Sequence, residues 1–160
     1  MNNELNSGLP DHDPPGHAGF LIRRLHQISV ALFAEECETL DITPTQFGIM
    51  LAIAAQPGID QSTAAEERGV DRATMASIVA RLEQNGYIRR VTGRADRRQK
   101  LLTLTAAGKK LLAKAQAPAE RATERALEPL SPRERKALKR LMEKLVEANN
   151  SHGRAKLRLR

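Results

Sequence analysis

The stretch Asp71–Gly86, DRATMASIVARLEQNG, decides the fold, because it carries the start, the stop and the apolar stripe of one amphipathic helix. Asp71 is a good N-cap, since its side-chain oxygen can accept a hydrogen bond from the free amides of Ala73 or Thr74. Gly86 is the residue type that best tolerates the left-handed conformation after a helix end. Helical spacing places the apolar residues on one stripe, made by Met75, Ile78, Val79 and Leu82.

The face opposite this stripe carries only small or hydrogen-bonding residues. At about 100° per residue, it holds Ala73, Thr74, Ser77, Ala80, Arg81 and Gln84. Long acidic side chains are absent there, so the helix backbone could approach a nucleic-acid groove closely. Taken alone, the pattern would still indicate no more than an ordinary amphipathic helix.

The flanking segments turn this helix into part of a larger motif. Asp60 can cap a short helix over Gln61–Arg68, and Gly69-Val70 is a tight connection that matches helix-turn-helix spacing. After Gly86, residues 87–91 and 100–104 are predicted to be the two strands of a hairpin, with residues 92–98 as its loop. The sequence therefore predicts a mainly α fold, a winged helix-turn-helix over about 43–105 with a two-stranded β-hairpin wing.

The positive charge of the chain is concentrated in two places. From residue 89 to residue 100 the hairpin carries a local charge of +5, from Arg89, Arg90, Arg94, Arg97, Arg98 and Lys100 against Asp96. The last ten residues carry +4, from Arg154, Lys156, Arg158 and Arg160. Since the whole chain has a net charge of +7, the remainder is slightly negative. A localised patch of this kind indicates a polyanionic partner such as DNA.

Several segments together resemble the MarR family of bacterial transcription regulators. They are VDRAT at 70–74, RLEQNGYIRR at 81–90, DRR at 96–98 and LTLTAAG at 102–108. The resemblance covers roughly residues 19–149, and it implies that Arg98 enters the minor groove while Asp96 helps to hold it. Together with the open helix face, this predicts a set of DNA-binding residues, namely Arg72, Ala73, Thr74, Ser77, Arg81, Arg94, Asp96, Arg97 and Arg98.

The rest of the chain is predicted to be one domain over residues 17–150, between a flexible arm at 1–16 and a basic tail at 151–160. Capping boxes at Thr43–Gln46 and Ser131–Glu134 open two further helices, and Thr105 caps a long one in which Pro118 should bend or break the helix. The terminal helices, about 18–40 and 106–149, carry wide apolar stripes. They are therefore expected to form the dimerisation region of a homodimer, although packing back within one chain stays open. A dimer would place two reading helices about 34 Å apart on a pseudo-palindromic operator.

A small-molecule effector is predicted from the first helix. Its sequence, GFLIRRLHQISVALFAEE at 19–36, is similar to that of MarR-family regulators of aromatic-acid catabolism, and family members often bind aromatic acids near this helix. Arg23, Arg24 and His26 are the polar groups able to hold a carboxylate, with His17 as a further candidate. The alternative is that both arginines are solvated or paired with acids.

Other classes of function find no support in the sequence. No P-loop, GxGxxG or nucleophile elbow is present, and the histidines lack metal-ligand spacing, so we expect no enzyme, no metal and no cofactor. No apolar run approaches the roughly 18 residues of a membrane span, no signal peptide is recognisable, and the single cysteine fits a reducing cytoplasm.

The sequence therefore predicts a homodimeric repressor that binds double-stranded DNA and is released by a small aromatic carboxylate. Two alternatives stay open. One is an architectural DNA-binding protein that needs no effector. The other is a peroxide-sensing repressor that uses Cys37, although its acidic neighbours should raise the thiol pKa.

Overall fold

The computed structural model describes residues 17–93 and 99–153, together with Ala155 and Leu157. The predicted arm at 1–16 lies outside these residues. The elements in chain order are α1 (Ala18–Glu36), α2 (Pro44–Ala55), β1 (Ile59–Asp60), α3 (Gln61–Arg68), α4 (Arg72–Gln84), β2 (Ile88–Thr92), β3 (Lys100–Leu104), α5 (Ala106–Leu127), α6 (Pro132–Asn149) and the short 3-10 helix η1 (Asn150–His152).

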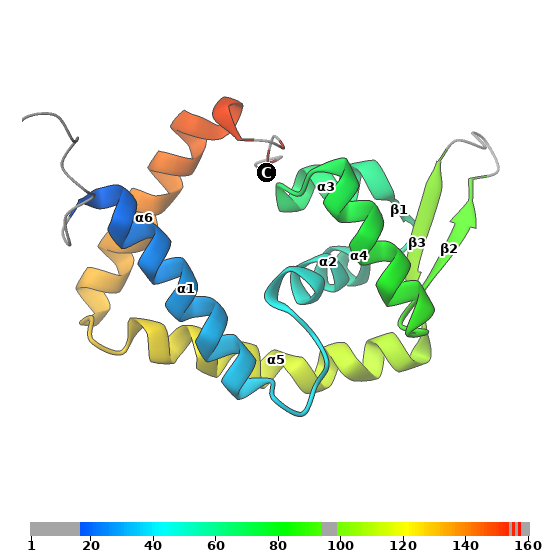
Figure 1. Cartoon of the computed structure of the whole chain (residues 1–160), viewed down its shortest axis with the longest axis horizontal. Helices are drawn as coiled ribbons and strands as arrows, with labels where there is room; N and C mark the ends of the chain where they lie inside the picture. Colours follow the sequence, from blue (N-terminus) through cyan, green and yellow to red (C-terminus); the bar gives the residue numbers. More distant parts are fainter. Residues whose placement is uncertain (1–16, 94–98, 154, 156, 158–160) are drawn as a thin grey trace, which may run out of the picture.

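The elements form two lobes that α5 connects (Figure 1). Helices α2, α3 and α4 and the small sheet make one lobe, and α1 and α6 lie at the other end of α5. The buried core is concentrated in the first lobe, where the largest fully enclosed side chains are Ile49, Met50, Ile53, Ile59, Met75, Val79, Leu82 and Leu102. The predicted mainly α winged helix-turn-helix is confirmed.

Helix starts agree closely with the capping residues of the sequence. Thr43 and Ser131 both form complete capping boxes, with Gln46 and Glu134 as their reciprocal partners. Asp60, Asp71 and Thr105 accept backbone amide hydrogen bonds at the starts of α3, α4 and α5. These bonds satisfy amides that have no partner within the helix, which is why each helix begins where it does.

The sheet has three strands in the order β1-β3-β2, whereas the sequence predicts a two-stranded hairpin. The extra strand is β1, whose Ile59 lies opposite Leu102 of β3. Gly58, at a φ of 85°, turns the chain after α2, and its amide donates to the Leu102 carbonyl at 2.9 Å. A strand of two residues is too short to show an alternating pattern, so the sequence could not reveal it.

The structure differs from the sequence in two further details of the helices, the possible break at Pro118 and the end of the first helix. Helix α5 is not broken at Pro118 but continues to Leu127. The proline leaves the Lys114 carbonyl without its helical donor, and Lys114 is exposed, so water can hydrate that carbonyl. Helix α1 ends at Glu36 instead of residue 40. Glu35, Glu36 and Glu38 cluster at this end, where negative charge interacts unfavourably with the helix dipole.

The first turn of α5 lies directly against the chain that enters the wing. The Thr105 hydroxyl donates to the Gly86 carbonyl at 2.6 Å, and the Thr105 amide donates to the Tyr87 carbonyl at 3.0 Å. A Cβ atom added at Gly108 would lie 1.9 Å from the Tyr87 carbonyl oxygen. Position 108 therefore has to be glycine for this close approach.

The end of the described chain returns to the helix-turn-helix. The Asn150 side chain makes two hydrogen bonds with the backbone of Leu157, at 2.7 and 2.8 Å. The Leu157 side chain lies near Gly69, in the turn between α3 and α4.

Candidate DNA-binding interface and effector cavity

Helix α4 presents an open face to solvent. Its stripe residues Met75, Val79 and Leu82 are buried against the core. The predicted contact residues on the other side are all exposed, namely Arg72, Ala73, Thr74, Ser77 and Arg81. The structure therefore brings these five residues onto one accessible surface. It can enter a major groove without unpacking the core.

The N-terminus of α4 is held by one carboxylate. The Thr74 amide donates to Asp71 at 2.9 Å, and the Thr74 hydroxyl donates to the same carboxylate at 2.7 Å. These bonds, the amide bond first, lower the pKa of Asp71. Because the Thr74 proton is committed to Asp71, the Thr74 hydroxyl is set to accept a hydrogen bond from a base.

The turn before α4 has the geometry of a helix-turn-helix. Gly69 ends α3 in the left-handed conformation at a φ of 60°, which costs little for a residue without a Cβ atom. The Val70 amide donates to the Ala65 carbonyl at 3.0 Å, so the turn is closed by a backbone hydrogen bond. The direction of α4 relative to α3 is thereby fixed by the backbone.

The wing is a regular antiparallel hairpin. Strands β2 and β3 pair from Ile88 opposite Leu104 to Thr92 opposite Lys100, and the Gly93 amide donates to the Gln99 carbonyl at 3.0 Å. The predicted wing contacts lie outside the described residues, namely Arg94, Asp96, Arg97 and Arg98.

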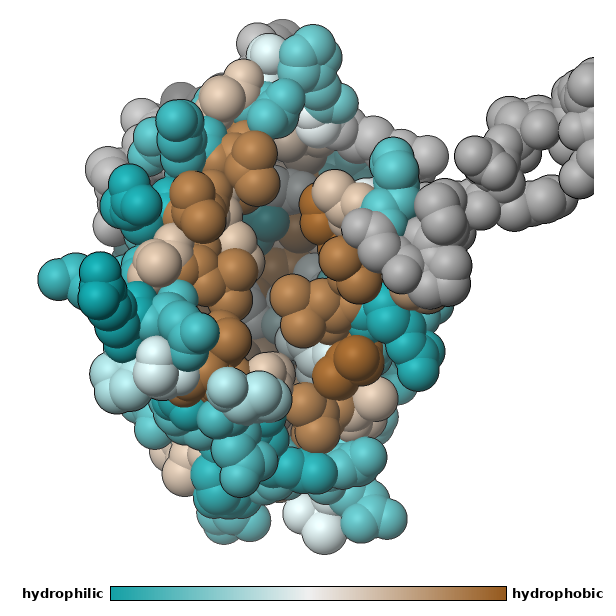
Figure 2. All heavy atoms as spheres, turned by 90° about the vertical axis from the view of Figure 1, so that its left-hand side faces the viewer, coloured by the Kyte–Doolittle hydropathy of each residue, from teal (hydrophilic) through white to brown (hydrophobic). Residues whose placement is uncertain are grey.

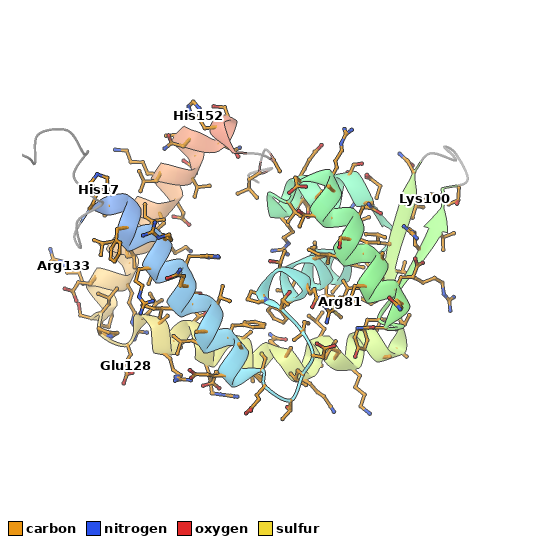
Figure 3. All side chains as sticks on the ribbon, in the orientation of Figure 1. His17, Arg81, Lys100, Glu128, Arg133 and His152 are labelled. Carbon is orange, nitrogen blue, oxygen red and sulfur yellow. The ribbon has the colours of Figure 1, made fainter. Side chains whose placement is uncertain are left out.

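Two ion pairs at this surface could not be anticipated from sequence spacing. Arg90 of β2 pairs with Glu83 of α4 at 2.8 Å, and the Glu83 carboxylate also accepts from the Arg90 amide at 3.2 Å. Arg81 of α4 pairs with Asp41 of the loop between α1 and α2 at 3.3 Å. Figure 3 labels Arg81 and Lys100, which lie on α4 and on the wing. The first pair ties the wing to α4, and the second ties α4 to the segment that follows α1.

A cavity of about 480 Å³ lies between α1, α2 and α5, at the junction of the two lobes. Phe33 of α1 and Phe47 of α2 form its aromatic wall, with ring centroids 5.8 Å apart. The other lining residues are Ser29, Pro44, Leu51, Gln116, Ala119, Glu120, Thr123 and Glu124. Apolar walls with a few polar groups and this volume suit a small aromatic ligand.

The four predicted effector residues lie on or beside α1, and none of them lines this cavity. His26 precedes Ser29 by one helical turn, on the side of α1 that faces the cavity. Arg24 points from the other side of the helix and donates to Gln27 at 3.4 Å. The Arg23 guanidinium lies over the Phe20 ring at 5.4 Å, and His17 is the N-cap residue of α1. The sequence missed Phe33, Phe47 and Gln116, because three separate elements bring them together.

An ion-pair cluster fixes the end of α1 on α5. Arg121 donates to Glu36 at 2.8 Å, and Arg125 donates to Glu36 and to Glu35, each at 3.0 Å. The hydrogen bond from Arg121, followed by that from Arg125, lowers the pKa of Glu36. The same cluster raises the pKa of Arg125, with Glu36 as the first cause. These pairs hold one wall of the cavity at a set distance from the other.

Cys37 does not resemble a reactive thiol. Its side chain is buried, and burial followed by the neighbouring Glu36 carboxylate raises its pKa. A buried and protonated thiol reacts slowly with peroxide, because the thiolate is the nucleophile. The geometry therefore disfavours the peroxide-sensing alternative.

The open α4 face, the helix-turn-helix and the basic hairpin define a winged helix-turn-helix DNA-binding protein. Residues 40–99 match the family model described as MarR family. The chain is 35% identical over 127 residues to the transcriptional regulator HosA of Escherichia coli O111:H-, covering 79% of this chain and 93% of that protein. The chain belongs to the MarR family, whose members are DNA-binding transcriptional regulators and not enzymes.

Solved structures of this family are similar over nearly the whole chain. The PcaV regulator of Streptomyces coelicolor, in complex with its natural ligand, has a TM-score of 0.78 and 31% identity and covers 88% of this chain and 99% of its own. BpsR of Bordetella bronchiseptica, whose DNA binding is regulated by 6-hydroxynicotinic acid, has a TM-score of 0.78 and 28% identity and covers 86% and 97%.

The part of the chain that the structure describes contains neither a membrane-spanning helix nor a group of side chains suited to a metal ion. There, no helix is both long and apolar enough to cross a membrane. Within the same residues, no group of three or more histidine, cysteine, aspartate or glutamate side chains could hold a metal ion.

Proposed function

We propose that this protein is a homodimeric repressor that occupies a pseudo-palindromic operator and is released by a small aromatic carboxylate. The observation that carries the proposal is the exposed face of α4, whose residues Thr74, Ser77 and Arg81 stand clear of the core beside a basic wing. Acting on DNA inside a bacterial cell, the protein would work in the cytoplasm.

The surfaces of α1 and α6 support the dimer. Nearly all of the large apolar side chains that stay exposed belong to these two helices, namely Leu21, Ile22, Leu25, Ile28, Val30, Leu141, Met142, Leu145 and Val146. Helix α6 buries no residue within the chain. Figure 2 shows apolar side chains gathered along both sides of a hollow on this face. A contiguous apolar surface of this kind is typical of a protein interface, and a second copy would cover it.

The cavity between α1, α2 and α5 supports the effector. It lies where the dimer helices meet the DNA-binding lobe, so its occupant can bias how the two lobes sit. PcaV was solved with its natural ligand and BpsR responds to 6-hydroxynicotinic acid, and both resemble this chain over most of its length. An effector of this kind must bind the DNA-free form more tightly than the DNA-bound form.

The acidic residues that line the cavity limit where the carboxylate of the effector can bind. Glu120 and Glu124 line the cavity, and among the described residues an ion pair is formed by Glu124, with Arg135, and not by Glu120. We therefore assign the carboxylate of the effector to the α1 side, with His26 as the first candidate and Arg23, Arg24 and His17 as the others. Glu120 would repel that carboxylate and set a limit on its affinity.

Calorimetry with benzoates, cinnamates and pyridine carboxylates, 6-hydroxynicotinic acid among them, tests this proposal. A ligand should weaken DNA binding by roughly 5–150-fold, the range of typical allosteric coupling. The substitution His26→Gln should lower the affinity for the ligand, whereas Glu120→Gln should raise it. If no acid binds and DNA affinity is unaffected by any of them, the effector-independent alternative is favoured and the effector part of the proposal fails.

Base contacts are tested separately. Replacing Ser77 or Arg81 should weaken specific binding by about 1–3 kcal/mol per lost base contact, while binding to scrambled DNA changes less. Gel-shift titrations on both duplexes measure the difference. Equal losses on the two sequences would show that these residues touch only phosphates.

A further inference from the structure

The loop between α1 and α2 presents a carboxylate to the reading helix. Asp41 accepts a hydrogen bond from the Arg81 guanidinium at 3.3 Å, although forty residues separate the two in sequence. The two side chains are 75% and 57% exposed, so DNA can reach the guanidinium.

The backbone on either side of Asp41 is anchored. Before it, the Leu40 amide donates to the Cys37 carbonyl at 2.8 Å, and Cys37 is buried. After it, Ile42 is buried in the core and Thr43 begins the capping box that opens α2. The fold therefore holds the backbone of Asp41 near α4, within reach of the Arg81 guanidinium.

The Arg81 guanidinium cannot bind the Asp41 carboxylate and DNA fully at the same time. A guanidinium that binds a phosphate or a guanine has to give up its carboxylate partner, at least in part. The carboxylate left behind would also stand close to the phosphate backbone, where like charges repel. Both effects oppose DNA binding.

We propose that Asp41 is an internal competitor of DNA for Arg81 and thereby lowers the affinity of the protein for its operator. The inference rests on the proposed reading face, because it requires Arg81 to contact DNA. The contribution of Asp41 should be small, about two- to fivefold in affinity, because both side chains are exposed and such pairs are weak.

The competitor adjoins the proposed effector cavity. Pro44 and Phe47 line that cavity and follow Asp41 by three and six residues, in the first turn of α2. A ligand that shifts this turn would move Asp41 relative to Arg81. The segment Asp41–Phe47 is thus a short covalent route from the cavity to the reading helix.

A double-mutant cycle tests the proposal. The variants are Asp41→Asn, Arg81→Ala and both together, with Glu38→Gln as a matched control. Glu38 is exposed in the same loop, and its substitution removes the same charge. Affinity would be measured by fluorescence anisotropy on a duplex selected from a random library by the wild-type protein, at several salt concentrations.

Asp41→Asn should bind this duplex about two- to fivefold more tightly than wild type, and the gain should shrink as salt screens the pair. Glu38→Gln should change affinity less. In the Arg81→Ala background, Asp41→Asn should have no more effect than Glu38→Gln.

Three outcomes would overturn the proposal. Weaker binding by Asp41→Asn would mean that the carboxylate orients Arg81 for DNA. An equal gain with and without Arg81 would mean a general charge effect. Unchanged affinity in Arg81→Ala would remove Arg81 from the DNA contacts, while DNA binding by the family fold would stand. Failure of the wild-type protein to select any duplex would instead refute the proposed function itself.

Discussion

Gly108→Ala is the substitution on which local and tertiary effects disagree most clearly. Position 108 lies in the first turn of α5, where helix propensity alone predicts that alanine stabilises by about 1 kcal/mol. The added Cβ atom, however, would lie 1.9 Å from the Tyr87 carbonyl oxygen, whereas real Cβ atoms essentially never come within 3.0 Å of another heavy atom. The backbone of α5 and that of the wing must therefore separate by more than 1 Å.

The cost of this separation can be estimated from the groups it disturbs. Overpacking a tight contact costs about 1–3 kcal/mol. The Tyr87 carbonyl also accepts from the Thr105 amide at 3.0 Å, and the Thr105 hydroxyl donates to the neighbouring Gly86 carbonyl at 2.6 Å; each hydrogen bond lost costs about 0.5–1.5 kcal/mol. Even after the gain in propensity, we expect a net loss of about 2–4 kcal/mol, which lowers the melting temperature by roughly 5–15 °C.

Gly48→Ala is the matched control. Gly48 also lies inside a helix, and the nearest atom to a Cβ built there is the Arg68 Cδ at 4.0 Å. The Gly48→Ala variant should be more stable than wild type by about 0.5–1 kcal/mol. Urea denaturation of both variants, followed by circular dichroism at one protein concentration, gives the comparison. If Gly108→Ala is as stable as Gly48→Ala, the close contact between α5 and the wing is refuted.

Three further outcomes are expected. The arginine partners of Glu36 lower its pKa, so Glu36→Gln should be less stable than wild type at pH 7 in urea denaturation. The difference in the free energy of unfolding should narrow as the pH falls below the ordinary carboxyl pKa of 4.5. A difference that does not change with pH would contradict the pairing. Leu145→Asp should give monomers or aggregates by light scattering, whereas Lys144→Asp should stay dimeric. For the wing, Asp96→Ala should weaken operator binding at every salt concentration if Asp96 orients Arg98, and tighter binding in gel-shift titrations would show a merely basic loop.

Capping residues and apolar stripes predicted most of this fold. Asp60, Asp71, Thr105 and the two capping boxes act within four residues of themselves, so a single sequence carries their information in full. The α4 stripe likewise reports burial because one core lies on one side of the helix. The exposed face of α4 followed from the same pattern, and its contact with DNA stays a prediction.

Features that depend on distant partners were not predictable. Strand β1 exists because Ile59 meets Leu102, more than forty residues later. Pro118 is tolerated because the carbonyl that loses its donor belongs to Lys114, which is exposed. The exposure of that residue could not be predicted from the local sequence. The cavity between α1, α2 and α5 needs Phe33, Phe47 and Gln116 together, and each of them alone is an ordinary helix residue.

The same distinction applies to the charge of the DNA-binding surface. The sequence counts Arg81 and Arg90 as cations available to DNA, but each faces a carboxylate in the folded chain, Asp41 and Glu83 respectively. Arg89 and Lys100 differ, since both are exposed and, within the described residues, the Lys100 ammonium donates to the neutral Thr92 hydroxyl. If Arg81 and Arg90 contact DNA as proposed, DNA affinity at this surface would depend on a competition between phosphates and internal carboxylates. A regulator that must leave its operator gains from such a balance, because a small change in one internal pair then alters occupancy.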